Sequence, residues 1–253
     1  MTTLENKQPS STIDSNPDAG SNEAQSPQTL AIDIGGSGVK VMVLNAAGDP
    51  VTERDRLDTP QPATPQAVIE AIQNLAAGKS FDRVSVGFPG VIRRGVTCTA
   101  ANLDSSWIGY DLGTTLTQLL GKPTKVINDA DMQGLGAVAG NGVELVITLG
   151  TGVGSALFLD GSLVPNLELG HHPFRKGETY EEQLGRAALE AVGKKRWNQR
   201  LEKAIATLDH FFNYDLLYIG GGNTKKIDLT LPENVKIVPN ISGLLGGIAL
   251  WKH

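Results

Sequence analysis

Two glycine-rich turns between strand-like runs constrain this chain more than any other feature. GGSG at 35–38 follows the apolar run TLAIDI, and GTGVG at 150–154 follows ELVITL. A second β-rich run comes after each turn, which is the pattern of a strand, a tight turn and a strand. The two turns start 115 residues apart, which is too long for a solenoid repeat and suits a duplicated domain. The sequence therefore predicts two similar α/β halves.

Amphipathic segments between the strand-like runs predict helices. Thr64 and Pro65, for example, are typical of an N-cap and a first helical turn. The expected helices span residues 64–77, 111–121, 179–193, 194–213 and 242–251. Alternation of strands and helices indicates the α/β class. We expect a first α/β domain at 29–127, a second at 128–241, and a C-terminal helix at 242–252 that returns to the first domain.

Residues 1–28 are rich in Ser, Thr, Asn, Gln and Pro, with Leu4 and Ile13 almost alone as aliphatic residues. Such a segment buries too little apolar surface to offset its ordering entropy, so we expect a disordered tail. The rest of the chain has 21 basic and 23 acidic residues, a net charge of −2. This balance predicts no binding to nucleic acid.

The cysteine content bears on the compartment. Cys98 is the single cysteine, so the chain can form neither an internal disulfide nor a cysteine-rich zinc site, and a reducing compartment is expected. No apolar run approaches the roughly 18 residues of a transmembrane helix, and the N-terminus lacks the apolar region of a secretory signal. We therefore expect a cytoplasmic protein that does not bind membranes.

The two glycine-rich turns are candidate phosphate-binding loops. Glycine has no Cβ, so backbone N–H groups can approach an anion closely. One such turn alone could be an ordinary hairpin, whereas two facing turns can hold a phosphate chain. Neither turn has the GxxxxGK[ST] pattern of a Walker loop. The candidate donor-binding residues are Asp33, Gly35, Gly36, Ser37, Gly38, Lys40, Gly150, Thr151, Gly152 and Gly154.

Acidic residues follow the strand-like run TKVIN. Asn128, Asp129 and Asp131 stand where this strand ends and a helix begins. A carboxylate at the C-terminal end of a strand lies at the mouth of an α/β cleft, so Asp129 is the candidate general base. The alternative is that Asn128 or Asp129 only caps the helix.

A second polar cluster consists of Glu168, His171 and His172, after a turn that contains Asn and Pro. Carboxylate and imidazole groups on a loop are suitable partners for sugar hydroxyls. Two alternatives remain: histidines and a carboxylate can bind a metal ion, or the segment can be an ordinary surface loop.

Two further segments are candidates for contact with a donor. The glycines at 220–222 end the strand LLYI, and bare backbone there suits a nucleoside ring or a phosphate chain, with Gly221, Gly222 and Lys225 as candidates. A run of cations on one expected helix contains Lys194, Lys195, Arg196, Arg200 and Lys203. Such a run is either a solvated helix face or a track for a polyanion.

The motifs DIGGSGVK, FPGV, ANLDSSW, INDAD, TLGTGVG, ELGHH and YIGGGNTKK occur in this order. Together they resemble the sugar kinases of the ROK family, which have the actin-like ATPase fold. The resemblance covers residues 29–250 and implies two ribonuclease H-like domains that flank a cleft. Within the family, the DIGGSGVK opening, the TPQPATP stretch and INDAD are similar to members that use polyphosphate.

This resemblance implies a transferase that moves a phosphoryl group from inorganic polyphosphate, and also from ATP, to the 6-hydroxyl of glucose. It implies Asp129 as the base, Mg²⁺ held by Asp33 directly or through water, and a homodimer. The glucose-binding residues that it implies are Gly90, Asn102, Asn128, Glu168, His171 and Glu181. Two alternatives are an ATP-dependent glucokinase of the same family and a non-catalytic sugar-sensing protein.

One departure from the family pattern concerns zinc. Many members have a CxCGxxGC motif after the ELGH histidine, whereas this chain has HHPFRKGETYEEQLG there. We therefore expect no structural zinc.

Overall fold

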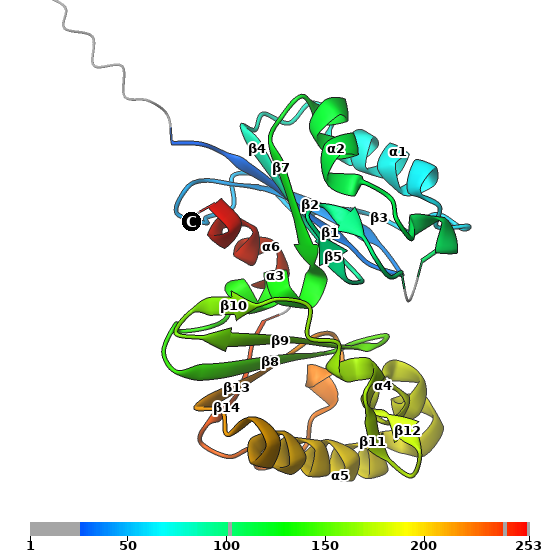
Figure 1. Ribbon diagram of the computed structural model, residues 1–253, viewed down its shortest axis with the longest axis vertical. Helices are drawn as coiled ribbons and strands as arrows, with labels where there is room; N and C mark the ends of the chain where they lie inside the picture. The colour runs from blue at the N-terminus through cyan, green and yellow to red at the C-terminus, as the bar shows by residue number, and fades with distance from the viewer. Residues whose placement is uncertain (1–25, 101–102, 240–241, 252–253) are drawn as a thin grey trace, which may run out of the picture.

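Two five-stranded sheets form the frame of the computed structural model, which describes residues 26–100, 103–239 and 242–251. Figure 1 shows one sheet above the other, with α3 between them. The first sheet has the order β3-β2-β1-β4-β7, and the second has the order β10-β9-β8-β13-β14. The strands of the first sheet are Thr29–Ile34 (β1), Val39–Leu44 (β2), Asp55–Leu57 (β3), Arg83–Phe88 (β4) and Thr124–Asn128 (β7). Those of the second are Val143–Leu149 (β8), Val153–Leu159 (β9), Ser162–Val164 (β10), Leu216–Gly220 (β13) and Val235–Ile237 (β14).

The two sheets repeat the same strand directions. In the first, β1 pairs with β2 antiparallel and with β4 parallel, and β4 pairs with β7 parallel. In the second, β8 pairs with β9 antiparallel and with β13 parallel, and β13 pairs with β14 parallel. The glycine-rich turns join the equivalent pairs β1–β2 and β8–β9. The expectation of two similar α/β halves is confirmed.

The remaining elements are helices, short 3₁₀ turns and two small hairpins. The helices are Pro65–Ala76 (α1), Leu112–Leu120 (α2), Asp129–Leu135 (α3), Tyr180–Leu184 (α4), Arg186–Phe212 (α5) and Ser242–Leu245 (α6). The 3₁₀ turns are Ser105–Trp107 (η1), Leu169–His171 (η2), Thr224–Lys226 (η3) and Gly246–Trp251 (η4). The hairpins pair Ile92–Arg93 (β5) with Val96–Thr97 (β6), and Pro173–Arg175 (β11) with Glu178–Thr179 (β12).

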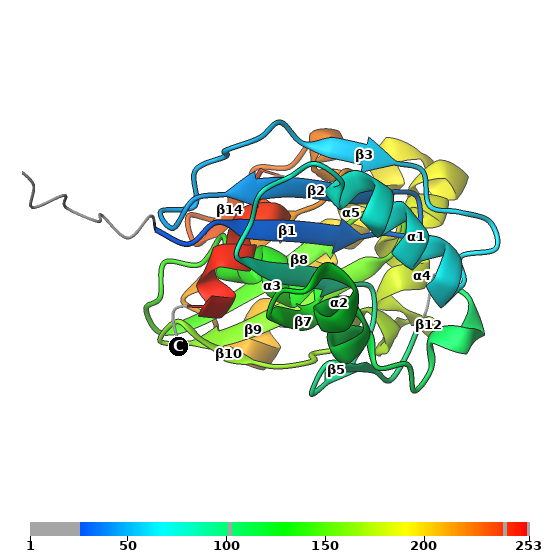
Figure 2. The same cartoon turned by 90° about the horizontal axis from the view of Figure 1, so that it is seen from above.

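The first core lies between the first sheet and helices α1 and α2, which Figure 2 shows on one face of that sheet. Thr64 caps α1 through a hydrogen bond from the Ala67 backbone N–H, as the sequence predicts. Trp107 is fully buried in this core and donates its indole N–H to the Ala63 carbonyl. Its polar atom is therefore satisfied while the large ring fills the space between helices and sheet.

Helices α4 and α5 cover the second sheet, with Trp197, Leu201 and Leu208 buried against it. The sequence predicts helices at 179–193 and 194–213. A break does occur at Gly193, where φ is +76°, but the chain also turns at Gly185, between α4 and α5. There the Arg186 N–H donates to the carbonyls of Gly150 and Thr151. The extra break thus anchors the start of α5 to the second glycine-rich turn.

The C-terminal segment, α6 and η4, packs against the first sheet. Leu244 and Ile248 join a buried cluster with Ala31, Met42 and Leu44. The Ser85 hydroxyl donates to the Gly247 carbonyl at 2.6 Å. This segment also contacts α3, so it supports the helix that carries the candidate base. Among the described residues, no helix is both long and apolar enough to cross a membrane.

Candidate active site

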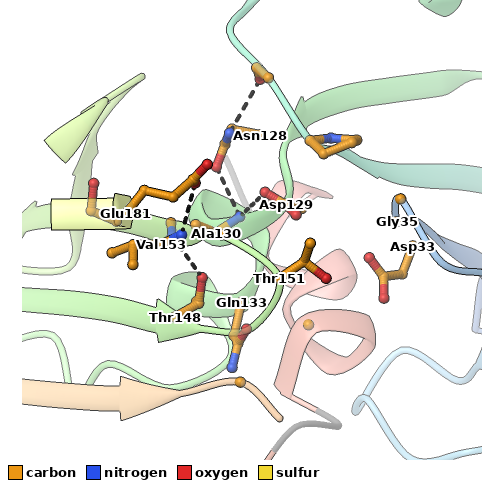
Figure 3. Close-up of a pocket in the computed structure, with 18 of the residues that line it drawn as sticks. Asp33, Gly35, Asn128, Asp129, Ala130, Gln133, Thr148, Thr151, Val153 and Glu181 are labelled. Atoms are coloured by element: carbon orange, nitrogen blue, oxygen red, sulfur yellow. Dashed lines mark hydrogen bonds between the residues drawn. The ribbon is translucent and has the colours of Figure 1, made fainter. Parts of the chain in front are cut away.

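A cleft of about 220 Å³ opens between the two sheets, at the ends of β1, β7 and β8. Both glycine-rich turns, the start of α3 and the 3₁₀ turn η2 meet there. Figure 3 shows Asp33 and Asp129 on different elements around this space, with Thr151 between them in the view. The predicted residues that line the cleft are Asp33, Gly35, Gly36, Ser37, Lys40, Gly90, Asn128, Asp129, Thr151, Gly152, Gly154, Glu168, His171, Glu181 and Gly221.

The second glycine-rich turn needs its small residues for steric reasons. A Cβ on Gly152 would collide with the Glu181 carboxylate, and one on Gly154 would lie 2.9 Å from Ala130 Cβ. Glu181 in turn accepts a hydrogen bond from the Val153 N–H at 3.1 Å. The glycines therefore let Glu181 and Ala130 pack directly against the backbone of the turn, which fixes its shape at the edge of the cleft.

The first glycine-rich turn carries an ion pair at the cleft. Asp33 and Lys40 are cross-strand partners on β1 and β2, and Lys40 Nζ lies 2.7 Å from Asp33 Oδ2. Outside the cleft, the Thr59 hydroxyl donates to the Gly35 carbonyl at 2.5 Å, which fixes the turn. One oxygen of Asp33 remains available to a ligand, beside a cation that attracts phosphate.

Asn128 and Asp129 begin α3, and the two residues have different tasks. The side chain of Asn128 is the N-cap, accepting from the N–H groups of Ala130 and Asp131 at 2.8 and 3.1 Å. Asp129 is the first helical residue, and its Oδ1 accepts from the Ala130 N–H at 2.8 Å. The capping role thus belongs chiefly to Asn128, which leaves Asp129 Oδ2 facing the cleft without a protein partner among the described residues.

The carboxyl of Asp129 is electrostatically suited to accept a proton. Burial, followed by the negative charge of Asp33, raises its pKa from 3.8 to about 7. The hydrogen bond from Ala130 opposes this shift. A general base works best when its pKa lies near the working pH, and pKa values shifted in this way are typical of catalytic groups.

The cluster around η2 brings a carboxylate and an imidazole to the cleft. His171 Nδ1 lies 3.1 Å from Glu168 Oε2. His172 is exposed and contacts the Pro173 carbonyl instead, so it does not join them. Within the described ranges, no group of three or more His, Cys, Asp or Glu residues could hold a metal ion by itself.

Some predicted residues lie apart from the cleft. Gly38 packs beside the Arg56 guanidinium, and Gly150 belongs to the base of its turn, where its N–H donates to the Gly152 carbonyl at 3.0 Å. Gly222 and Lys225 line a neighbouring pocket of about 600 Å³. Asn102 falls outside the described residues, so its predicted contact with glucose stays a prediction.

The cleft also contains polar residues that the sequence did not single out. Thr148 holds the second turn by accepting from the Gly154 N–H at 3.2 Å. Gln133 lies on α3, and its Nε2 is buried with no hydrogen-bond partner among the described residues. Its place could have been found from the helical spacing, since residue 133 follows Asp129 by one turn.

Asn166 forms a clasp between the two halves. Its Oδ1 accepts from the Ile92 N–H at 3.0 Å, and its Nδ2 donates to the Ile92 carbonyl at 3.1 Å. Its own N–H donates to Asp131 Oδ2 at 3.3 Å. Burial also raises the pKa of Asp131 to about 7. Because Asn166 stands two residues before Glu168, these bonds fix the η2 cluster relative to the β5–β6 hairpin of the first half.

We expect Asn166→Ala to raise the KM for the sugar roughly 5- to 30-fold, since two hydrogen bonds of about 1 kcal/mol each disappear. The kcat should change little, because the base is untouched. Asn166 has a φ of +59°, so Asn166→Gly is the control that tolerates this backbone conformation. Equal defects in both variants assign the effect to the side chain, whereas a normal KM in the glycine variant would assign it to backbone strain.

The fold and the cleft place this chain among known proteins. A model described as the ROK family matches residues 29–179, and the chain belongs to that family. The polyphosphate glucokinase of Mycobacterium tuberculosis (strain H37Ra) is 36% identical over 238 residues, which cover 86% of this chain and 88% of that protein.

Solved structures agree with this membership. The inorganic polyphosphate/ATP-glucomannokinase from Arthrobacter sp. strain KM is 38% identical, with a TM-score of 0.80, and the match covers 89% of this chain and 99% of that one. A ROK family glucokinase from Streptomyces griseus in complex with glucose and AMPPNP is 19% identical, with a TM-score of 0.76 over 88% of this chain and 98% of that one. The latter likeness shows the shared actin-like ATPase fold.

Proposed function

We propose that this protein transfers a phosphoryl group from inorganic polyphosphate, or from ATP, to the 6-hydroxyl of glucose and so forms glucose 6-phosphate. The observation that carries the proposal is the Asp129 carboxyl, which has a pKa of about 7 and shares one cleft with both glycine-rich turns. The relatives named for polyphosphate support the choice of donor.

In this mechanism the glucose 6-hydroxyl oxygen attacks the terminal phosphorus of the donor. Asp129 takes the hydroxyl proton as the new P–O bond forms and the bond to the leaving phosphate breaks. The donor leaves as a polyphosphate one unit shorter, or as ADP. The backbone of the turns at 35–38 and 150–154 and the Lys40 ammonium stabilise the charge that spreads over the phosphate oxygens.

The sugar is oriented by Glu168 and His171, whose neighbouring polar groups can pair with vicinal hydroxyls. Asn128 adds an amide at the same wall, where its Nδ2 donates to the Gly90 carbonyl at 3.2 Å. Once a sugar covers polar groups of this kind, a sugar that leaves them unpaired is rejected. Asn102 and Glu181 complete the proposed set of sugar contacts.

Magnesium fits the donor end of the cleft. Mg²⁺ commonly binds through one or two carboxylates together with waters and substrate phosphates, not through a cage of protein ligands. Asp33 supplies one such carboxylate, with one oxygen paired to Lys40 and the other facing the cleft. When bound, Mg²⁺ neutralises phosphate oxygens, while the chain itself positions the donor and the base.

A coupled assay of purified protein with glucose tests the proposal. Polyphosphate free of nucleotide, ATP and GTP are each supplied as donor, and glucose 6-phosphate is measured. We expect turnover with polyphosphate at least as fast as with ATP. Turnover with ATP alone would favour the ATP-dependent glucokinase, and glucose binding without turnover for any donor would favour the sugar-sensing alternative.

The assembly and the compartment are also proposals. Family membership favours a homodimer, and the single cysteine favours a reducing compartment such as the cytoplasm. Light scattering at micromolar concentration should give about twice the chain mass. A mass near 26.7 kDa would contradict the dimer.

A further inference from the structure

A strongly basic groove lies outside the cleft, between α5 and the hairpin of β11 and β12. Its volume is about 620 Å³. Five cations line it, with a single carboxylate among them: Arg175, Lys176, Arg196, Arg200 and Lys203, together with Glu202. Figure 1 shows this hairpin and α4 beside one end of α5, at one side of the second sheet.

The helix spacing explains why these cations share one side of α5. Residues 196, 200 and 203 follow each other at intervals of four and three, so they lie along one face. The neighbouring stripe that contains Trp197, Leu201 and Leu208 is buried in the second core. Burial of that stripe fixes the rotation of the helix and so directs the basic stripe to the hairpin.

The hairpin supplies the opposite wall from a distant part of the sequence. Lys176 and Gly177 form its tight turn, with φ values of +57° and +79°. Arg175 faces Glu178 in the β11–β12 pairing, but the Glu178 carboxylate accepts a hydrogen bond from Gln183. Glu178, the acidic residue paired with Arg175 in the hairpin, is thus hydrogen-bonded to Gln183.

The cations of the groove have few partners within the protein. Within the described residues, Arg175, Lys176, Arg196 and Lys203 form no ion pair or side-chain hydrogen bond. The Lys and Arg ion pairs among the described residues join Lys40 with Asp33, Arg56 with Asp58, Lys79 with Asp55 and Lys194 with Asp228, so none involves a cation of the groove. Gathering five like charges in one place is unfavourable, and a bound polyanion would remove that repulsion.

The predicted basic run is split by the structure. Lys194 comes directly after the break in α5 at Gly193. It forms an ion pair with Asp228 and lines the same pocket as Lys225. Arg196 and Arg200 line the groove instead. The cations of the run at 194–203 therefore lie in two different places, because consecutive positions of a helix face different directions. Arg175 and Lys176 also line the groove, although they lie about 20 residues before Arg196 in the sequence.

Helix α4 links the groove to the donor turn. Arg200 Nη1 donates to the Gln183 carbonyl of α4 at 3.2 Å. On the same short helix, Glu181 accepts from the Val153 N–H beside the second glycine-rich turn. The groove and the donor turn are thus both hydrogen-bonded to α4, so a polyphosphate chain held in the groove stays close to the element that positions the donor.

We propose that this groove is a second binding site for inorganic polyphosphate, which anchors the distal part of a long chain while its end reacts in the cleft. The inference rests on the proposed function, since it assigns an additional site to the same donor. Polyphosphate matches the groove because it offers a regular row of anionic oxygens to arginine and lysine side chains. No aromatic ring lines the described groove for base stacking, which disfavours single-stranded nucleic acid.

When one polyphosphate chain is already bound at one of the two sites, its binding at the other site is effectively intramolecular. A long polyphosphate can engage the groove and the cleft together, whereas ATP and short polyphosphates reach only the cleft. The groove should therefore lower the KM for long chains without altering the chemical step. Its contribution should also weaken with salt, because several charged contacts form at once.

The test removes two groove cations with Arg196→Ala and Lys203→Ala in one variant of the full chain. The matched control is Arg54→Ala with Lys236→Ala, which removes the same charges from exposed positions on other elements. Binding of fluorescently labelled long-chain polyphosphate is measured by anisotropy at several salt concentrations. The KM for long polyphosphate, short polyphosphate and ATP is measured in parallel.

We expect the groove variant to bind long polyphosphate roughly 3- to 10-fold more weakly than the wild type, since exposed charge contacts are individually modest. Its KM should rise by a similar factor for long chains alone, with kcat unchanged. The control should match the wild type. Equal effects in the two double variants, or equal effects on long chains and ATP, would overturn the proposal.

Further outcomes separate the groove from its alternatives. Displacement of labelled polyphosphate by single-stranded RNA of equal charge would show an unselective polyanion surface and overturn the assignment. If melting shows that the alanine variant is unfolded, Arg196→Gln with Lys203→Gln repeats the test with most of each side chain retained. If the wild type binds polyphosphate but does not use it as a donor, the groove remains a polyphosphate site and the proposed donor is rejected. The proposal for the groove and the proposed function can therefore fail separately.

Discussion

Replacement of Asp129 by asparagine should lower kcat roughly 10²- to 10⁴-fold, the usual cost of losing a general base. The amide fills the same space but cannot take the hydroxyl proton. Glucose binding, measured by calorimetry, should stay within a few-fold of the wild type, because Asn128, Glu168 and His171 are unchanged. The N-cap of α3 should also persist, since Asn128 provides it.

The pH dependence provides the control for this variant. Since the pKa of Asp129 is about 7, the wild-type kcat/KM should fall as the pH drops below 7, and the residual activity of Asp129→Asn should not follow that curve. Asp131→Asn is the matched variant, because its carboxyl has a similarly raised pKa without lining the cleft. Near-normal turnover in Asp129→Asn would assign Asp129 to helix capping alone.

The raised pKa of Asp129 also makes the stability of the protein depend on pH. A carboxyl whose pKa is raised in the folded state binds its proton more tightly there than in the unfolded chain. The protonated Asp129 carboxyl therefore contributes fully to the free energy of unfolding below about pH 4, and this contribution is lost as the pH rises through about 7. Relative to the wild type, Asp129→Asn should therefore be more stable at pH 8 than at pH 4 in urea denaturation.

Replacement of Gly221 by alanine should lower the free energy of unfolding by about 2–4 kcal/mol. Gly221 has a φ of +90°, and a Cβ there would lie 2.6 Å from the Leu149 nitrogen and 2.7 Å from its carbonyl carbon. These atoms are backbone and cannot rotate away. Because Leu149 precedes the second glycine-rich turn, the donor KM should rise as well. Urea denaturation and donor kinetics measure the two effects.

Gly222→Ala is the matched control for stability. It stands next in the chain, and a Cβ there meets nothing within 4 Å. Its free energy of unfolding should stay within about 0.5 kcal/mol of the wild type. Equal destabilisation by the two substitutions would mean that the turn tolerates no side chain at all, and that the contact with Leu149 is not the cause.

The local sequence pattern was sufficient to predict the strands of the two sheets and many of the residues that line the cleft. The runs before Gly35 and Gly150 are mostly apolar because the strands are buried, and the glycines after them mark turns that only small residues allow. Periodicity and capping residues likewise placed α1 and α2. These features depend on neighbours within a few positions, which the sequence displays directly.

Contacts between distant segments could not be predicted in the same way. Asn166 looks like an ordinary turn residue until the fold brings Ile92 to it. The break at Gly185 follows from the bonds of Arg186 to the second glycine-rich turn. The basic groove needs Arg175 beside Arg196. Each depends on tertiary geometry, so no local propensity marks it.

The return of the C-terminal segment to the first sheet affects how the chain is made. Ala31 and Met42 leave the ribosome well before their partners Leu244 and Ile248, which follow them in the sequence by some two hundred positions. One face of the first sheet therefore stays open to water and to other chains until the segment with Leu244 and Ile248 has been made. A newly made protein truncated before residue 242 would expose that face permanently, which makes it a target for chaperones and proteases.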